Sequence, residues 1–210
     1  MTEGVLLVGA SGLAREVLAA GMTGVVGVLD DDPELQGEHV GGVPVLGPVA
    51  AAAGRREQLL LCIGPSGARR KVARRLGRAG IEAHRYATYV ARSARIGSTV
   101  DIGPGSIVLD GVAVTADAVL GRHVVVMPNC TITHDGVIED FATLTSGVSL
   151  AGGVSVGEAA YIGMNASVRQ GLRVGAAATV GMGAVVLGDV PSGETWAGNP
   201  ARRLGESTHD

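Results

Sequence analysis

The sequence contains one histidine that is followed directly by an acid, His134-Asp135. A neutral imidazole is the side chain best suited to take a proton from an amine or hydroxyl near neutral pH. The carboxylate of Asp135 could orient the ring and raise its basicity. The pair is therefore a candidate general-base site, and the alternative is that His134 is only a solvated surface residue.

Two other groups near this pair could carry chemistry. Cys130 could act as an acyl-accepting nucleophile, although its place in the repeat described below predicts a buried structural thiol. His123 and His134 together raise the possibility of a metal site. No third histidine lies between residues 90 and 186, and no two histidines are five residues apart. The sequence therefore predicts no zinc site.

The element that positions these residues is a repeat. Every sixth residue from Val90 to Val186, seventeen in all, is Val, Ile or Leu. The residue four places further on is mostly small or β-branched. Fixed-period self-similarity indicates stacked units that bury their apolar faces on one another. Three such hexads would make a triangular coil of 18 residues, with one short strand on each side.

This register places the candidate residues. With Ile132 buried, His134 falls at a corner of the coil, Cys130 points inward, and Gly152 lies one coil beyond His134 on the same corner. Glycines recur on one 18-residue series, where we expect them to relieve the backbone at corners: Gly103, Gly121, Gly157 and Gly175.

The first part of the chain has a different pattern. Apolar runs at residues 4–8, 25–29, 43–46 and 59–63 alternate with helical patterns after Ser11, near residues 48–53 and at 66–78. Residues 81–83 could form one more strand. This alternation predicts a small α/β domain with a parallel sheet of Rossmann-like type. We place this domain at residues 1–84 and the coil with a closing C-terminal segment at residues 85–210.

The glycine-rich turn Gly9-Ala10-Ser11-Gly12 follows the first strand and opens the first helix. Such a turn can present backbone N–H groups to a phosphate. Asp30, at the end of the second strand, could accept hydrogen bonds from a ribose or a base. A third glycine is missing, since Ala14 occupies its place, and plain tight-turn packing is the alternative.

The composition narrows the possible partners. The formal charge of the 210 residues is −3 and there is no long basic run, which gives no electrostatic support for a nucleic-acid or anionic-membrane partner. The two cysteines make no disulfide framework, and nothing resembles a signal peptide or a membrane span. We therefore expect a cytoplasmic protein.

The hexads are similar to those of the hexapeptide-repeat acyltransferases, whose repeats wind as a left-handed parallel β-helix. The segment Gly198-Asn199-Pro200-Ala201-Arg202 resembles the signature that closes their catalytic region. Together with the opening turn and Leu29-Asp30-Asp31, residues 4–204 resemble the sialic acid O-acetyltransferase and bacillosamine-pathway N-acetyltransferase group. That resemblance implies a homotrimer.

The resemblance also implies roles for particular residues. Acetyl-CoA would be the acyl donor, without a metal, and the tetrahedral oxyanion would need a hydrogen-bond donor, which the N–H of Gly152 could supply. Thr143, Met164 and Met182 would line the CoA groove, with ordinary corner packing as their alternative. Phosphates of a nucleotide sugar would bind at Gly9, Ser11, Gly12 and Leu13, and the nucleoside at Asp30 and Asp31. Gly64 ends the third strand at the same edge of the sheet and would belong to this substrate site. Arg69 either belongs to the site as well or lies on a solvated helix face.

We therefore predict an acetyltransferase that acts on the amine of a nucleotide-linked amino sugar by direct attack. One alternative is O-acetylation of sialic acid or another glycan hydroxyl. A second is a non-catalytic trimeric scaffold that binds nucleotide sugars, against which the retained His134-Asp135 pair argues.

Overall fold

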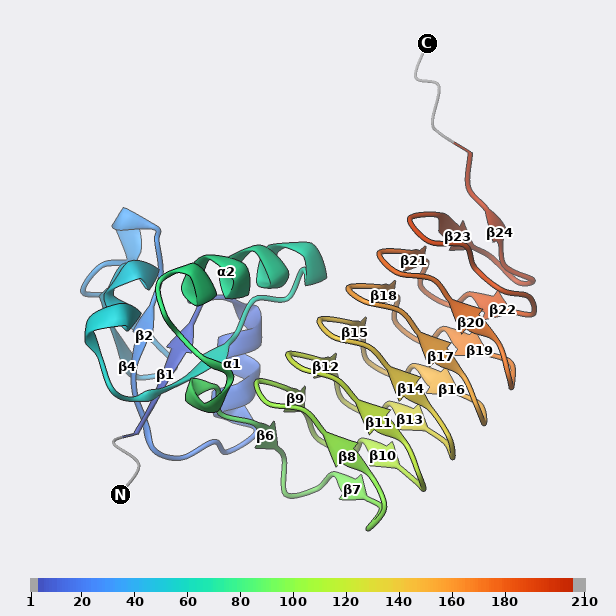
Figure 1. Cartoon of the computed structure of the whole chain (residues 1–210), viewed down its shortest axis with the longest axis horizontal. Coiled ribbons are helices and arrows are strands. Elements are labelled where there is room, and N and C mark those ends of the chain that lie inside the picture. The colour runs from blue at the N-terminus through green and yellow to red at the C-terminus, as the bar shows by residue number, and fades with distance from the viewer. Residues whose placement is uncertain (1–3, 206–210) are drawn as a thin grey trace.

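The computed structural model describes residues 4–205. It consists of a small α/β part followed by a long stack of two-residue strands (Figure 1). Among the described residues, no helix is long and apolar enough to cross a membrane.

The α/β part is built on a five-stranded sheet in the order β3-β4-β2-β1-β5. Its strands β1, β2, β4 and β5 are parallel, whereas β3 pairs with β4 in the antiparallel sense. The strands and helices of this part are β1 (Val5–Val8), α1 (Gly12–Ala19), β2 (Val25–Leu29), β3 (His39–Val40), β4 (Val43–Gly47), β5 (Gln58–Leu61) and α2 (Ser66–Arg78), with 3₁₀ turns at Pro33–Leu35, Val49–Gly54 and Ala83–Arg85.

The strands of this sheet are apolar on both faces because both faces are covered, which is usual for parallel sheets. Leu7 on one face packs with Leu13 of α1, and Leu6 on the other face packs with Leu76 of α2. α1 begins where the Ser11 hydroxyl accepts a hydrogen bond from the N–H of Leu13 at 3.1 Å, a standard N-cap.

The prediction of a strand at residues 81–83 is wrong. Ile81 is buried in the core beside α2, and the 3₁₀ turn Ala83–Arg85 follows it. The chain reaches the sheet only at Tyr86, which forms an isolated bridge with Leu59.

The stack confirms the parallel, coil-upon-coil packing that the six-residue period predicts. Up to residue 168, each strand pairs in parallel with the strand 18 residues further on, as Ile132 does with Leu150 and Ile138 with Val156. The last turn is shorter, since Thr179 pairs with Thr195, and the closing pair β23–β24 is antiparallel. The inward residues Ile132, Ile138 and Leu144 are fully buried in one continuous core.

The strands of the stack form three sheets. The first, which faces the α/β part, holds β6 (Tyr89–Val90), β9 (Ile107–Val108), β12 (Val125–Val126), β15 (Thr143–Leu144), β18 (Tyr161–Ile162), β21 (Thr179–Val180), β23 (Thr195–Ala197) and β24 (Arg202–Arg203). The second holds β7 (Arg95–Ile96), β10 (Ala113–Val114), β13 (Thr131–Ile132), β16 (Ser149–Leu150), β19 (Ser167–Val168) and β22 (Val185–Val186). The third holds β8 (Asp101–Ile102), β11 (Val119–Leu120), β14 (Val137–Ile138), β17 (Ser155–Val156) and β20 (Arg173–Val174).

The corners of the coil have a backbone signature. Every sixth residue from Gly105 to Gly183 has a positive φ, and eight of them are not glycine: Asp117, His123, Asn129, Asp135, Phe141, Ala159, Asn165 and Ala177. The left-handed conformation costs an L-residue about 1–2 kcal/mol, so the stacked coils must hold these residues in place.

The expectation that Gly103, Gly121, Gly157 and Gly175 relieve the backbone is wrong, because none of them has a positive φ. They are required by close approach instead. A Cβ atom on Gly157 would lie 2.5 Å from the backbone nitrogen of Ala176 in the next coil, and one on Gly175 would lie 2.4 Å from that of Ser192.

Candidate functional site

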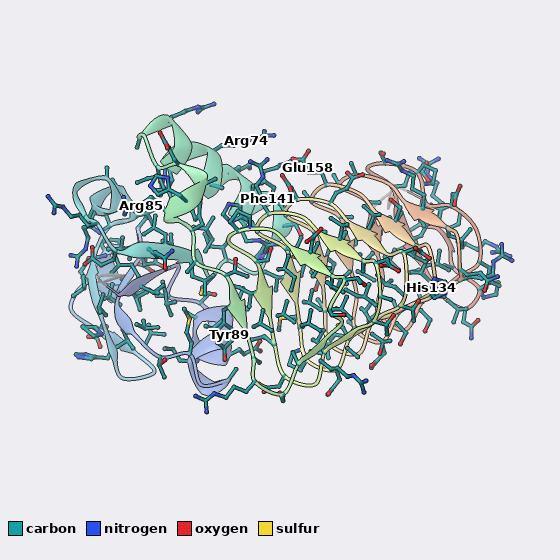
Figure 2. The ribbon with its side chains drawn as sticks, turned by 60° about the horizontal axis from the view of Figure 1, so that its bottom comes forward. Arg74, Arg85, Tyr89, His134, Phe141 and Glu158 are labelled. Atoms are coloured by element: carbon teal, nitrogen blue, oxygen red, sulfur yellow. The ribbon has the colours of Figure 1, made fainter. Side chains whose placement is uncertain are left out.

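His134 and Asp135 lie at the corner between β13 and β14, on the edge of the coil opposite the sheet that faces the α/β part. Figure 2 shows His134 well away from Arg74 of α2 and from Phe141 and Glu158. The Nδ1 atom of His134 is 2.7 Å from Oδ2 of Asp135, and the side chains are 66% and 65% exposed. With Nδ1–H donating to the carboxylate, the free Nε2 is the nitrogen that can accept a proton.

Gly152 lies against the imidazole, one coil further on. A Cβ atom on Gly152 would be 2.4 Å from Cε1 and 2.5 Å from Nε2 of His134, so only glycine leaves the ring in its place. The carbonyl of His134 accepts a hydrogen bond from the N–H of Gly153 at 2.9 Å, while the N–H of Gly152 has no acceptor within residues 4–205. A free backbone N–H on the residue that contacts the imidazole is suited to stabilising an oxyanion.

The other residues predicted for CoA do not share this corner. Met164 and Met182 lie one coil apart at the corner between the first and second sheets, where they are 49% and 79% exposed. Thr143 lies on β15 of the first sheet and is buried. Its hydroxyl is 2.8 Å from that of Ser66 on α2, so its side chain joins the coil to the α/β part.

A cavity of about 740 Å³ lies between the N-terminal ends of α1 and α2 and the first sheet of the coil. Three of the predicted substrate residues line it: Gly12, Leu13 and Gly64. The two helix ends direct their N–H groups and the positive ends of their dipoles to this region, which favours an anion.

Gly9, Ser11 and Asp30, which are also predicted to bind substrate, make contacts that stabilise the turns after β1 and β2. Gly9 has φ +104° and lies so close to the carbonyl of Cys62 that a Cβ atom would be 2.9 Å from the oxygen. The hydroxyl of Ser11 donates to the same carbonyl at 2.7 Å. Asp30 accepts hydrogen bonds from the N–H groups of Ala10 and Asp32 at 2.7 and 2.9 Å.

Asp31 also has protein partners. Its carboxylate accepts from the N–H of Val49 at 3.0 Å and pairs with Arg75 at 2.5 Å. Neither Asp30 nor Asp31 is among the residues that line the 740 Å³ cavity.

Sequence reasoning missed the polar residues that α2 and the coil bring to this cavity. Ser66 and Arg70 of α2 and Tyr161 of β18 line it. Nothing in the local sequence marks them, because their position depends on which side of the coil α2 meets. Arg69 is completely buried rather than on a solvated helix face.

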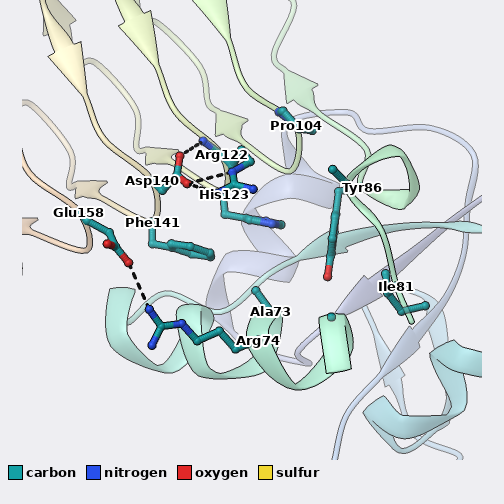
Figure 3. A pocket seen from close by; sticks show the side chains of 12 residues that line it. Ala73, Arg74, Ile81, Tyr86, Pro104, Arg122, His123, Asp140, Phe141 and Glu158 are labelled. Atoms are coloured by element: carbon teal, nitrogen blue, oxygen red, sulfur yellow. Dashed lines mark hydrogen bonds and ion pairs between the residues drawn. The ribbon is translucent and has the colours of Figure 1, made fainter. Parts of the chain in front are cut away.

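A second cavity, of about 400 Å³, lies further along α2, where Ala73, Arg74 and Gly77 of its C-terminal half line it (Figure 3). His123 forms its inner wall, stacked on Phe141 at a centroid distance of 5.0 Å and edge-on to Tyr86 at 4.5 Å. Burial, with the neighbouring charges of Arg69 and Arg122, lowers the pKa of His123 to about 4. His123 is therefore neutral at physiological pH.

Cys130 is buried, as its place in the repeat predicts, and its thiol lies 3.0 Å from the carbonyl of Thr145. Burial raises the pKa of Cys130 to about 11. Since the thiolate is the nucleophile, Cys130 is not a candidate for acyl transfer. Within residues 4–205, no three His, Cys, Asp or Glu side chains are grouped so that they could hold a metal ion.

Comparison with known structures agrees with this architecture. PerB of Caulobacter crescentus, solved with CoA and GDP-perosamine, is 33% identical over 96% of this chain and 97% of its own, with a TM-score of 0.88. The acetyltransferase domain of PglB from Neisseria gonorrhoeae, solved with acetyl coenzyme A, is 30% identical over 97% and 100%, with a TM-score of 0.87. WeeI of Acinetobacter baumannii is 28% identical over 95% and 99%, with a TM-score of 0.84.

No family model and no curated protein matched the sequence. The likeness to PerB and PglB nevertheless extends over almost the whole of each chain at 30% identity or more. The chain therefore belongs to the hexapeptide-repeat sugar acetyltransferases. It is an acyltransferase, as the sequence predicts.

Proposed function

We propose that this enzyme transfers an acetyl group to the amine of a nucleotide-linked amino sugar. The observation that carries the proposal is the contact between Gly152 and the imidazole of His134, whose other nitrogen is held by Asp135. The acyl donor is acetyl-CoA. Relatives support the acceptor class, since the Caulobacter crescentus GDP-perosamine N-acetyltransferase was solved with CoA and GDP-perosamine.

In the proposed reaction, the acceptor amine attacks the thioester carbonyl while Nε2 of His134 takes its proton. The new C–N bond forms a tetrahedral oxyanion, which the N–H of Gly152 stabilises. Collapse of this intermediate breaks the C–S bond, and the CoA thiolate takes up the proton from the imidazolium. No covalent enzyme intermediate forms, in keeping with the buried, protonated thiol of Cys130.

Variants of the Caulobacter crescentus enzyme in which a histidine is replaced by alanine or asparagine have been solved with CoA and GDP-perosamine. Ligand binding that survives loss of a histidine fits a role for that side chain in chemistry rather than in affinity. We assign His134 the corresponding role here.

The nucleotide sugar would occupy the 740 Å³ cavity, with its phosphates at Gly12, Leu13 and Gly64. This cavity faces the first sheet, whereas His134 lies at the opposite corner of the same coil. Met164 and Met182 lie at yet another corner. We therefore propose a homotrimer in which the cavity of one subunit, and the CoA groove, are completed by the corner of a neighbour.

The substrate proposal can be tested by thermal-shift binding of UDP-, dTDP- and GDP-linked amino sugars in the presence of CoA. Ligands that stabilise the protein would then be assayed for acetyl transfer by release of the CoA thiol. We expect one nucleotide amino sugar to be N-acetylated, with amide formation confirmed by mass spectrometry. Acetylation of free sialic acid, with no turnover of any nucleotide amino sugar, would overturn the proposal in favour of O-acetylation.

A further inference from the structure

Arg69 lies in the wall between the α/β part and the coil, and its side chain is 0% exposed. It sits in the second turn of α2, four residues beyond the N-cap Pro65. A fully buried arginine is unusual, because the charged guanidinium loses its hydration.

The guanidinium donates to six oxygen atoms. Two belong to the turn between β5 and α2, namely the carbonyls of Ile63 and Gly64 at 2.7 and 2.9 Å. The other four belong to two adjacent coils: the carbonyls of His123, Phe141 and Ala142 at 2.9, 2.8 and 3.2 Å, and Oγ1 of Thr143 at 2.9 Å. All five N–H donors of the arginine are thus used.

None of these acceptors is a carboxylate, and no ion pair among residues 4–205 includes Arg69. Burial lowers the pKa of Arg69 to about 10, so the group remains charged at neutral pH. The wall therefore contains a positive charge that no described side chain neutralises.

This charge lies in the wall of the proposed substrate cavity, without lining the cavity itself. Two of its acceptor residues, Gly64 and Thr143, also line the cavity. The adjacent N-terminus of α2 adds to the positive potential, since Pro65 supplies no side-chain cap and the first turn has no acidic residue.

The lining of the cavity contains two charged side chains, Glu16 and Arg70. Arg70 is paired with Glu158 at 3.2 Å. Arg69 therefore differs from Arg70 in having no protein counterion among residues 4–205.

We infer that Arg69 is a positioning residue for the phosphate-bearing part of the substrate. Arg69 fixes the turn between β5 and α2 on the coil. Its charge is neutralised by the diphosphate only when the substrate is bound. This inference rests on the proposed nucleotide-sugar function, and it assigns to the charge an effect on substrate affinity, not on the acetyl-transfer step.

A purely structural role predicts a different outcome. In that role Arg69 serves only to satisfy six oxygen acceptors, so an apolar replacement leaves them without a donor and lowers the free energy of unfolding. The charge would then be dispensable for binding, and its removal would alter only the melting temperature.

The test uses two variants of the full chain, Arg69→Met and Arg69→Lys. Calorimetry would measure binding of GDP-perosamine, GDP and UDP, with CoA, which we place at the corner of Met164 and Met182, as the comparison ligand. For Arg69→Met we expect affinity for the phosphate ligand to fall about tenfold or more, because a buried charge attracts the diphosphate through the low-dielectric wall without touching it. CoA affinity and kcat at saturating acceptor should stay within about threefold of the wild type, because the lost interaction concerns only binding of the phosphate-bearing part of the acceptor.

Arg69→Lys separates charge from shape and serves also if Arg69→Met fails to fold. A buried lysine has a strongly lowered pKa. The affinity of this variant for the phosphate ligand, divided by that of the wild type at each pH, should fall about fivefold or more between about pH 5 and about pH 9.5, as the lysine loses its charge. The titratable neighbours do not interfere, since burial raises the pKa of Cys62 and lowers that of His123 to about 4.

The inference would be overturned by unchanged affinity of Arg69→Met for the phosphate ligand, or by a relative affinity of Arg69→Lys that does not vary with pH. Either result would leave the proposed function standing. If none of GDP-perosamine, GDP and UDP binds the wild-type protein, the proposed function fails and the inference fails with it.

Discussion

Gly152→Ala should displace the imidazole of His134, the proposed general base, without disturbing the fold. The new Cβ atom would lie 2.4 Å from Cε1 of His134, whereas carbon atoms in contact are about 3.5–4.0 Å apart, so the ring must move by about 1 Å. His134 is two-thirds exposed and can move into solvent. Because Gly152 does not have a positive φ, alanine brings no backbone strain, and stability should change by less than about 0.5 kcal/mol.

The same displacement should be severe for catalysis. A misplacement of about 1 Å in a reacting group can cost about a hundredfold in rate, equivalent to about 2.7 kcal/mol. We therefore expect kcat for acetyl transfer to fall by about that factor, while CoA binding and the melting temperature are retained. The assay is steady-state release of the CoA thiol together with a thermal melt.

Gly188→Ala is the matched control. Gly188 occupies the equivalent corner two coils further on, it also lacks a positive φ, and a Cβ atom there would meet nothing within 4 Å. Activity and stability should both be preserved. The double variant Gly152→Ala/His134→Asn should be no slower than His134→Asn alone, because the methyl group acts through the ring. A kcat for Gly152→Ala within about threefold of wild type would refute this reasoning, since even a modest misplacement costs more.

Three further predictions concern single side chains. Asp135→Asn keeps a residue that tolerates positive φ but removes the carboxylate that orients His134. We expect kcat to fall about tenfold or more, with little change in the melting temperature. An unchanged kcat would contradict the assignment of Asp135 as the residue that orients His134. His123, with its pKa lowered to about 4 from 6.5, binds its proton more readily in the unfolded chain, so wild-type stability should fall by about 3 kcal/mol as pH decreases from 6.5 to 4. His123→Asn should lack that component in urea titrations, and an identical acid profile would be evidence against it. The thiol of Cys130 should stay protonated until the pH approaches 11. The native protein should therefore not react at Cys130 with a thiol reagent at neutral pH, and Cys130→Ala should retain its activity. A fast-reacting Cys130 or an inactive variant would reject the buried-thiol interpretation.

The coil could be predicted from the sequence because its period is strict and local. Burial of Ile132 fixes the direction of every neighbouring side chain, so the corner position of His134 and the place of Gly152 one coil away followed from counting. The structure adds the contact itself, which depends on the ring conformation of His134 and on the absence of a Cβ atom at Gly152.

The contact between the α/β part and the coil could not be predicted in this way. Arg69 occurs within a run of basic residues on α2 and resembles in type its half-buried neighbour Arg70 and its exposed neighbour Lys71. Its burial depends on how α2 packs against His123 and Phe141, which lie more than 50 residues further along the chain. Such a long-range packing choice leaves no periodic signal in the local sequence.

The most direct test of the account is the rate of acetyl transfer by His134→Asn, measured on the nucleotide amino sugar that the wild-type enzyme acetylates. A general base contributes about 10²–10⁴-fold. We predict a loss of kcat in that range, with subunit assembly by analytical ultracentrifugation and CoA binding by calorimetry unchanged. Turnover close to that of the wild type in an intact, CoA-binding variant would contradict the assignment of His134 as the base.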